Sequence, residues 1–172
     1  MKEFNNSVFF NGTDYCMQNI KLKELSENSE TPFYVYDMNF IINNYNKLKA
    51  CFPWEDVRLH YAMKANYNPH MLKIMKDNGF CLDTVSPAEV IMAKKIGFDS
   101  DNILFTANNM TDAEMELVKA QGVLFNIDSL SRLEAYGKAY NGSKVCLRIN
   151  PDVQAGENIK VATAGALSKF GI

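Results

Sequence analysis

The chain has 172 residues, enough for one domain with a substantial core and too few for several large ones. Its hydrophobic fraction of 47% and charged fraction of 22% are ordinary for a globular protein and exclude a disordered or collagen-like chain. Lysine and arginine number 18 against 20 aspartates and glutamates, and this net charge of -2 argues against binding to nucleic acid.

The sequence predicts a cytoplasmic protein that does not enter membranes. No apolar run approaches the roughly 20 residues that cross a bilayer, and the first residues lack the apolar core of a secretion signal. The four cysteines are far apart and form no C-x-x-C pair, so we expect reduced packing residues and no metal site. They are Cys16, Cys51, Cys81 and Cys146.

The first 30 residues differ in pattern from the rest. Residues 7–10 and 15–17 flank a turn-rich link and predict a short hairpin, and residues 22–25 predict one helical turn. We therefore assign residues 1–30 to an N-terminal β segment and residues 31–172 to a second domain. A short apolar run at 33–36, after Pro32, predicts a strand.

From residue 38 onward, expected helices alternate with expected strands. Apolar residues at helical spacing or capping residues predict helices at 38–52, 69–79, 87–97, 111–121 and 129–140. Two of these helices begin with capping boxes, at residues 86–89 and 111–114. Short apolar runs predict strands at 57–63, 80–85, 103–106, 123–127 and 144–149.

Strands and capped helices that alternate without hairpin turns are typical of parallel β/α units. Such units form either a doubly wound open sheet or an eight-stranded barrel. A (β/α)8 barrel needs about 250 residues. The five core strands therefore predict a partial (β/α)8 barrel, and we expect the chain to be a truncated part of one.

Reactive side chains fall at the carboxyl ends of three predicted strands, where parallel β/α folds bind ligands. Lys64 ends the first strand and shares a face with His60 and Ala62, because side chains alternate along a strand. Asp83 lies near the end of the next strand, and Arg148 lies on an otherwise apolar one. The three side chains are expected to converge on one rim.

Each of these residues has an alternative interpretation. Lys64 could be a solvated lysine at a strand end, and Asp83 a residue of a helix-entry turn. A buried Arg148 requires an anion, which an ion pair with Asp83 or Glu89 would satisfy. His60 and His70 are isolated, and neither is expected to bind a metal.

Seven blocks in register resemble the alanine-racemase-fold (fold type III) pyridoxal-phosphate decarboxylases, in particular the members that act on diaminopimelate. The resemblance covers nearly all of the chain but about the first two fifths of a family member. The blocks are residues 31–37 (TPFYVYD), 61–66 (YAMKAN), 83–89 (DTVSPAE), 105–109 (FTANN), 125–129 (FNIDS), 147–152 (LRINPD) and 168–172 (SKFGI).

The resemblance implies a site and a reaction. Lys64 would be the catalytic lysine that holds pyridoxal 5'-phosphate as a Schiff base, with Asp83 and Arg148 beside the cofactor, Ala62 under its ring and Glu89 nearby. The implied reaction is decarboxylation of meso-2,6-diaminopimelate to L-lysine and CO2, the last step of lysine biosynthesis. The implied assembly is a homodimer with a shared active site.

Two alternatives to this function remain, namely another substrate for the same type of reaction and a protein without catalytic activity. A related decarboxylase of ornithine, lysine, arginine or carboxynorspermidine would fit the same motifs, and so would a pyridoxal-phosphate-binding fragment without turnover. Other residues that the family uses are expected to lie beyond Ile172. The 172-residue piece alone is therefore expected to be inactive.

Overall fold

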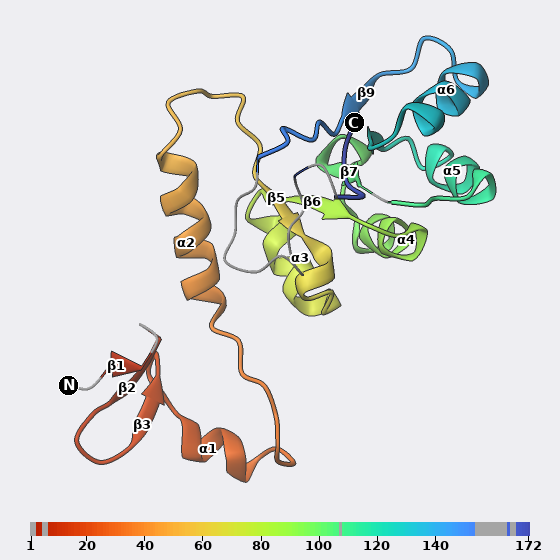
Figure 1. Cartoon of the computed structure of the whole chain (residues 1–172). Coiled ribbons are helices and arrows are strands. Elements are labelled where there is room, and N and C mark those ends of the chain that lie inside the picture. Colours follow the sequence, from red (N-terminus) through yellow and green to blue (C-terminus); the bar gives the residue numbers. More distant parts are fainter. Residues whose placement is uncertain (1–2, 5–6, 107, 154–164, 166–167) are drawn as a thin grey trace. The chain divides into compact units, whose positions relative to one another are not determined.

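The computed structural model describes residues 3–4, 7–106, 108–153, 165 and 168–172 (Figure 1). The chain divides into two compact units, Met1–Val57 and Arg58–Ile172. This division differs from the boundary expected after residue 30, because the first long helix groups with the N-terminal unit. The assignment of residues 31–57 to the barrel domain stays a prediction.

The N-terminal unit contains an antiparallel sheet of four short strands in the order β1-β2-β3-β4, followed by two helices. The predicted hairpin is confirmed as β2 and β3, in which Phe9 lies opposite Cys16. The strands are β1 (Glu3–Phe4), β2 (Val8–Phe10), β3 (Tyr15–Met17) and β4 (Ile20–Lys21), and the helices are α1 (Leu22–Glu27) and α2 (Met38–Ala50).

Polar contacts fix the hairpin of this unit. Asn11 Oδ1 accepts hydrogen bonds from the backbone N–H groups of Thr13 and Asp14, each at 2.9 Å, and this closes the turn. Asp14 also pairs with Lys21 across the sheet at 3.0 Å. The hydrogen bond and charge of Asp14 raise the pKa of Lys21 above its ordinary value.

One predicted strand of this unit is wrong. Residues 33–36 form no strand, and no strand among the described residues pairs with them. Tyr34 is 89% exposed, so the apolar run does not mark a buried position. The predicted turn at 22–25 is the longer helix α1. Helix α2 begins at Met38, and its N-cap is Asp37, whose side chain accepts from the N–H of Phe40 at 3.0 Å.

The second unit is a sheet of five parallel strands in the order β5-β6-β7-β8-β9, with a helix after each of the first four (Figure 1). The strands are β5 (His60–Ala62), β6 (Cys81–Thr84), β7 (Ile103–Phe105), β8 (Leu124–Ile127) and β9 (Val145–Leu147). The α-helices are α3 (Pro69–Asp77), α4 (Pro87–Ile96), α5 (Asp112–Lys119) and α6 (Leu130–Ala139). Two single turns of 3-10 helix, η1 (Met63–Ala65) and η2 (Ser100–Asn102), complete it.

The strand order separates the two predicted folds. In a doubly wound sheet the order reverses at a switch point, whereas in a barrel each strand lies beside the next along the chain. Here all five strands follow chain order, so the expected partial (β/α)8 barrel is confirmed.

The helices begin where the sequence predicts. Thr111 and Glu114 form a complete capping box, with the Glu114 carboxylate accepting from Thr111 N–H at 2.8 Å and Thr111 Oγ1 accepting from Glu114 N–H. The box expected at 86–89 is only half formed. Ser86 Oγ accepts from Glu89 N–H at 3.3 Å, but the Glu89 carboxylate accepts from Val85 N–H at 2.7 Å, one residue before the N-cap.

The core lies between the parallel sheet and its helices. The strand residues that face the helices are almost completely buried, and Phe125 of β8 packs on Tyr136 of α6 with ring centroids 4.9 Å apart. These strand residues are Leu82, Ile103, Phe105, Phe125 and Ile127, and their helix partners include Leu72, Val90, Ala93 and Val118.

The parallel hydrogen-bond pattern continues beside β9. Ile172 N–H donates to Arg148 O and Asn150 N–H donates to Ile172 O, each at 2.8 Å. This is the alternating pattern of a parallel ladder. The segment 168–172 therefore lies beside the carboxyl end of β9.

Candidate functional site

The sheet of the second unit has one face away from the helices, called here the inner face. Strand register places Ala62, Asp83, Leu104 and Leu124 in one row across four strands. These residues alternate with the buried, helix-facing set, so their side chains lie on the inner face. The same alternation places Thr106, Asn126 and Arg148 on it, nearer the carboxyl ends of the strands.

Lys64 follows β5 immediately, in the single turn η1. The sequence predicts that Lys64 ends the strand, but β5 ends two residues earlier, at Ala62. Lys64 therefore lies outside the strand. Met63 anchors this turn, because its side chain is fully buried, and Lys64 itself is exposed. Among the described residues the Lys64 ammonium has no hydrogen-bond or ion-pair partner, so its nitrogen is accessible for reaction.

Asp83 lies beside Ala62 in the register of β5 and β6. Its Oδ1 atom is buried and has no hydrogen-bond partner in the described part of the chain. An unsatisfied buried carboxylate oxygen costs free energy, which folded proteins tolerate where a ligand supplies the missing donor. Asp83 is therefore available for a ligand that carries a proton or a positive charge.

Arg148 follows β9, and its N–H donates to Ile127 O at 2.8 Å. Its guanidinium carbon lies 4.4 Å from the ring centroid of Phe170. The ion pair with Asp83 or Glu89 that the sequence left open is absent from the described residues. The half-buried guanidinium thus has an aromatic neighbour, and its N–H donors have no acceptor among the described residues.

Glu89 has a local role in the structure. Its carboxylate accepts from Val85 N–H and so supports the entry into α4. The structure brings Lys64, Ala62, Asp83 and Arg148 to the inner face and its carboxyl rim, and it places Glu89 at the start of a helix beside that rim.

Sequence reasoning missed two polar residues of the inner face. Asn126 Nδ2 donates to Thr106 Oγ1 at 3.4 Å, which links β8 to the residue after β7. Period-two alternation applied to these strands would have identified both residues. The contact of Phe170 with Arg148 has no such signal.

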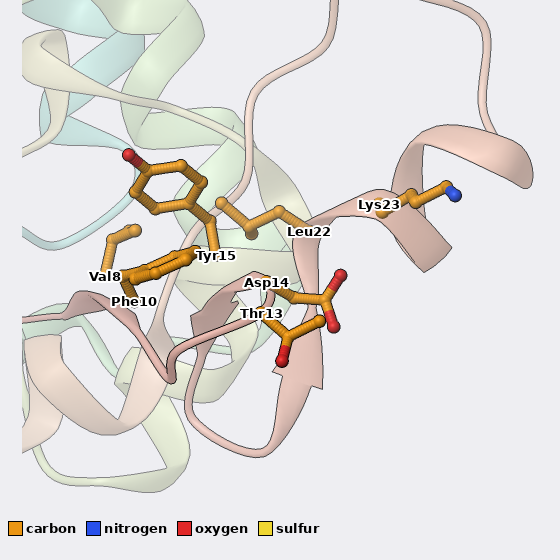
Figure 2. A pocket seen from close by; sticks show the side chains of 7 residues that line it. All are labelled: Val8, Phe10, Thr13, Asp14, Tyr15, Leu22 and Lys23. Carbon is orange, nitrogen blue, oxygen red and sulfur yellow. The ribbon is translucent and has the colours of Figure 1, made fainter.

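Two hollows lie outside this group of residues. A polar one of about 170 Å³ near the start of α6 is lined by Asn109, Met110, Asp128, Ser129, Ser131, Arg132 and Lys169. The other, of about 510 Å³, belongs to the N-terminal unit, and Figure 2 shows Val8, Phe10, Tyr15 and Leu22 grouped beside its hairpin. That hollow is mainly apolar and open, and no predicted site residue lines it.

The described residues lack two other features. No group of three or more His, Cys, Asp and Glu side chains is arranged to hold a metal ion. No helix of that part is long and apolar enough to cross a membrane.

The second unit is a partial β/α barrel with an exposed lysine directly after its first strand and with an aspartate and an arginine on its inner face, as is expected of a barrel that binds an aldehyde cofactor. Comparison with known families agrees. The family described as "Pyridoxal-dependent decarboxylase, pyridoxal binding domain" matches residues 38–172. The chain belongs to this family.

Curated relatives cover the chain almost completely. The diaminopimelate decarboxylase of Aquifex aeolicus is 33% identical over 100% of this chain and 42% of the relative. That of Methanothermobacter thermautotrophicus is 40% identical over 87% of this chain and 36% of the relative. The chain thus spans about two fifths of the length of these relatives.

Solved structures share the fold. The diaminopimelate decarboxylase of M. jannaschii in complex with L-lysine has a TM-score of 0.83 and 30% sequence identity, over 98% of this chain and 41% of that one. The Helicobacter pylori enzyme, also with L-lysine, has a TM-score of 0.81 and 26% identity. The barrel fold and the β segment of this chain are therefore those of the fold type III decarboxylases.

Proposed function

We propose that this chain is the N-terminal part of a pyridoxal-phosphate-dependent decarboxylase that converts meso-2,6-diaminopimelate to L-lysine and CO2. The observation that carries the proposal is the accessible Lys64 amine directly after β5, beside the row that contains Ala62 and Asp83. The identities of 33% and 40% to diaminopimelate decarboxylases support the choice of substrate.

The residues on the inner face fit pyridoxal phosphate. The cofactor carries an aldehyde that an amine can hold, and its polar groups can lie beside a carboxylate and a guanidinium. Asp83 Oδ1 is buried and unpartnered among the described residues, as a site that awaits a ligand requires. Lys64, Asp83 and Arg148 would hold the cofactor, and Ala62 leaves space beside it.

Lys64 would have two functions. Its amine would hold the cofactor covalently at the aldehyde carbon, with the loss of one water molecule. When it does not hold the cofactor, its Nζ would carry a proton to or from the reacting carbon, and such proton transfer contributes about 10²- to 10⁴-fold to rate. When bound, pyridoxal phosphate supplies an electron sink for the charge left when CO2 departs.

Asp83 and Arg148 would orient the bound molecule. The carboxylate of Asp83 would accept a hydrogen bond from a proton-bearing group of the ligand, and Arg148 would offer several N–H donors to an oxyanion. Glu89, expected from the resemblance to lie near the cofactor, would act by holding the start of α4 in place.

A second substrate class has one observation in its favour. The lysine/ornithine decarboxylase of Vibrio vulnificus, solved with putrescine, has a TM-score of 0.67 and 26% identity. Diaminopimelate, ornithine, lysine and arginine therefore belong in one substrate panel. Turnover of ornithine but not of diaminopimelate would assign the protein to this second class.

We further propose that residues 1–30 belong to a β domain and residues 31–172 to the barrel. The same proposal includes a cytoplasmic homodimer with a shared active site. Sedimentation equilibrium of the native gene product tests the dimer, and a monomer with full turnover would contradict it.

The test of the cofactor site uses the native gene product and the variants Lys64→Ala, Lys64→Arg and Lys73→Ala. Lys73 is a matched control, because it lies on the exposed side of α3 with 67% of its side chain exposed. Borohydride reduction should fix pyridoxal phosphate on the peptide that contains Lys64, as peptide mass mapping detects. We expect this label in the parent and in Lys73→Ala, and its loss in both Lys64 variants. A label of parent intensity in Lys64→Ala would refute the site.

A further inference from the structure

The guanidinium of Arg148 lies against the ring of Phe170, which belongs to the SKFGI block at residues 168–172. The distance of 4.4 Å from the guanidinium carbon to the ring centroid is well inside the roughly 6 Å limit of a cation–π contact. Both side chains are half-buried, so water screens the contact incompletely.

Backbone contacts fix Phe170 relative to Arg148. Ile172 N–H donates to Arg148 O, and Asn150 N–H donates to Ile172 O, so the segment runs beside the end of β9. Between Phe170 and Ile172, Gly171 has φ +84, and a Cβ there would lie 2.7 Å from Asn150 N. Glycine is thus required for this close approach.

Side chains add to this placement. Ser168 Oγ accepts from Phe170 N–H at 3.2 Å. Asn150 accepts from Gly165 N–H at 3.0 Å and donates to Gly165 O at 3.1 Å, which holds the preceding part of the loop. The backbone at Phe170 is therefore fixed by contacts of Ser168 and Ile172, and its ring lies against Arg148.

The hydrogen-bonding capacity of Arg148 is not used by its described neighbours. A guanidinium carries five N–H donors, and the structure shows no hydrogen bond from that of Arg148 to any described residue. No carboxylate among the described residues pairs with Arg148. A half-buried, unpaired guanidinium on the rim of the inner face is suited to receive an anion from outside the chain.

We propose that Phe170 is a positioning residue that holds the Arg148 guanidinium, with its N–H donors free, for an oxyanion of the bound ligand. This inference rests on the proposed function, since that function supplies the ligand. The oxyanion is either the phosphate of the cofactor or a carboxylate of the substrate. Arg148 makes the contact with it, and Phe170 acts only through Arg148.

The experiment is a double-mutant cycle in the native gene product with Phe170→Leu, Arg148→Ala and the combined variant. Phe170→Tyr retains the aromatic face and serves as the conservative variant. Phe52→Leu is the matched control, because Phe52 is an exposed aromatic residue of the N-terminal unit. Equilibrium dialysis measures the Kd for pyridoxal 5'-phosphate and for pyridoxal, and decarboxylation assays measure KM and kcat.

The two sources of the oxyanion give different expected results. If it is the cofactor phosphate, Phe170→Leu weakens binding of pyridoxal 5'-phosphate about three- to thirtyfold and leaves that of pyridoxal unchanged. If it is a substrate carboxylate, the same change raises KM by a similar factor and leaves both cofactor affinities unchanged. In either case Phe170→Tyr restores the parent value, and Phe170→Leu has no effect once Arg148 is alanine.

Other outcomes would overturn the inference. The first is that Phe170→Leu changes Kd or KM by the same factor with and without Arg148. The second is that Phe170→Tyr does not restore the parent Kd or KM. The third is that Phe170→Leu keeps the parent values of both. The first outcome would indicate a purely structural role. Cofactor affinity is measured without turnover, so inactivity toward diaminopimelate would refute the proposed substrate and leave the cofactor arm of this test intact.

Discussion

Replacement of Asp83 by leucine should make the cofactor-free protein more stable and its cofactor binding weaker. Asp83 Oδ1 is buried without a hydrogen-bond partner among the described residues, and such a group costs about 1–3 kcal/mol. Only one of the two carboxylate oxygens is buried without a partner, so we expect the lower end of this range of costs. The free energy of unfolding should therefore rise by about 1 kcal/mol in Asp83→Leu. Asp83→Asn, which keeps a polar group, should gain less.

Cofactor binding should change in the opposite direction. Hydrogen bonds to charged groups contribute about 1.5–3 kcal/mol, which corresponds to a roughly 10- to 100-fold weaker affinity for pyridoxal phosphate in Asp83→Leu. Urea unfolding of the cofactor-free native gene product measures the first effect, and equilibrium dialysis the second. Asp101→Asn, an exposed aspartate, is the control for both.

One result would refute this reasoning directly. If Asp83→Leu unfolds at a lower urea concentration than the parent, the carboxylate has a stabilising partner without the cofactor. If the stability of Asp83→Leu rises but its affinity for pyridoxal phosphate is unchanged, Asp83 does not bind this cofactor.

Two further predictions concern the scaffold. Leu82→Ala should lower the free energy of unfolding by about 2–5 kcal/mol, because the Leu82 side chain on β6 is completely buried against the helices. Leu130 is 67% exposed, so Leu130→Ala should change this free energy by less than about 0.5 kcal/mol. Urea unfolding measures both variants. Hydrogen bonds from the backbone and hydroxyl of Thr111 lower the pKa of Glu114 below 4.5, so its contribution to stability is present above that value and is lost as the pH falls through the folded-state pKa. Urea midpoints between about pH 6 and pH 3 should therefore fall more steeply in the parent than in Glu114→Gln, and equal slopes would contradict the linkage.

Most of the β/α barrel could be predicted from the sequence, because its signals are local. Capping residues such as Ser86 and Thr111 mark helix starts, and short apolar runs mark strands buried against helices. The run at 33–36 has the same composition but no neighbouring strand, so the prediction there was wrong. The two-residue strands β1 and β4 are too short to show any periodicity.

The candidate site was predicted in part for the same reason. Alternation with period two is sufficient to place Ala62, Asp83 and Arg148 on one face once the strands are known. The unsatisfied Asp83 Oδ1 and the Arg148–Phe170 contact depend on packing between segments far apart in the chain. No local pattern encodes such contacts.

The two faces of the parallel sheet have different roles, and this has a consequence for engineering. Stability comes from side chains that point toward the helices, whereas the reactive groups point the other way on alternate residues of the same strands. A combinatorial library confined to the inner face, for instance at Thr106, Asn126 and Cys146, would vary chemistry while most of its members still fold. Substrate preference could in this way evolve at little thermodynamic cost.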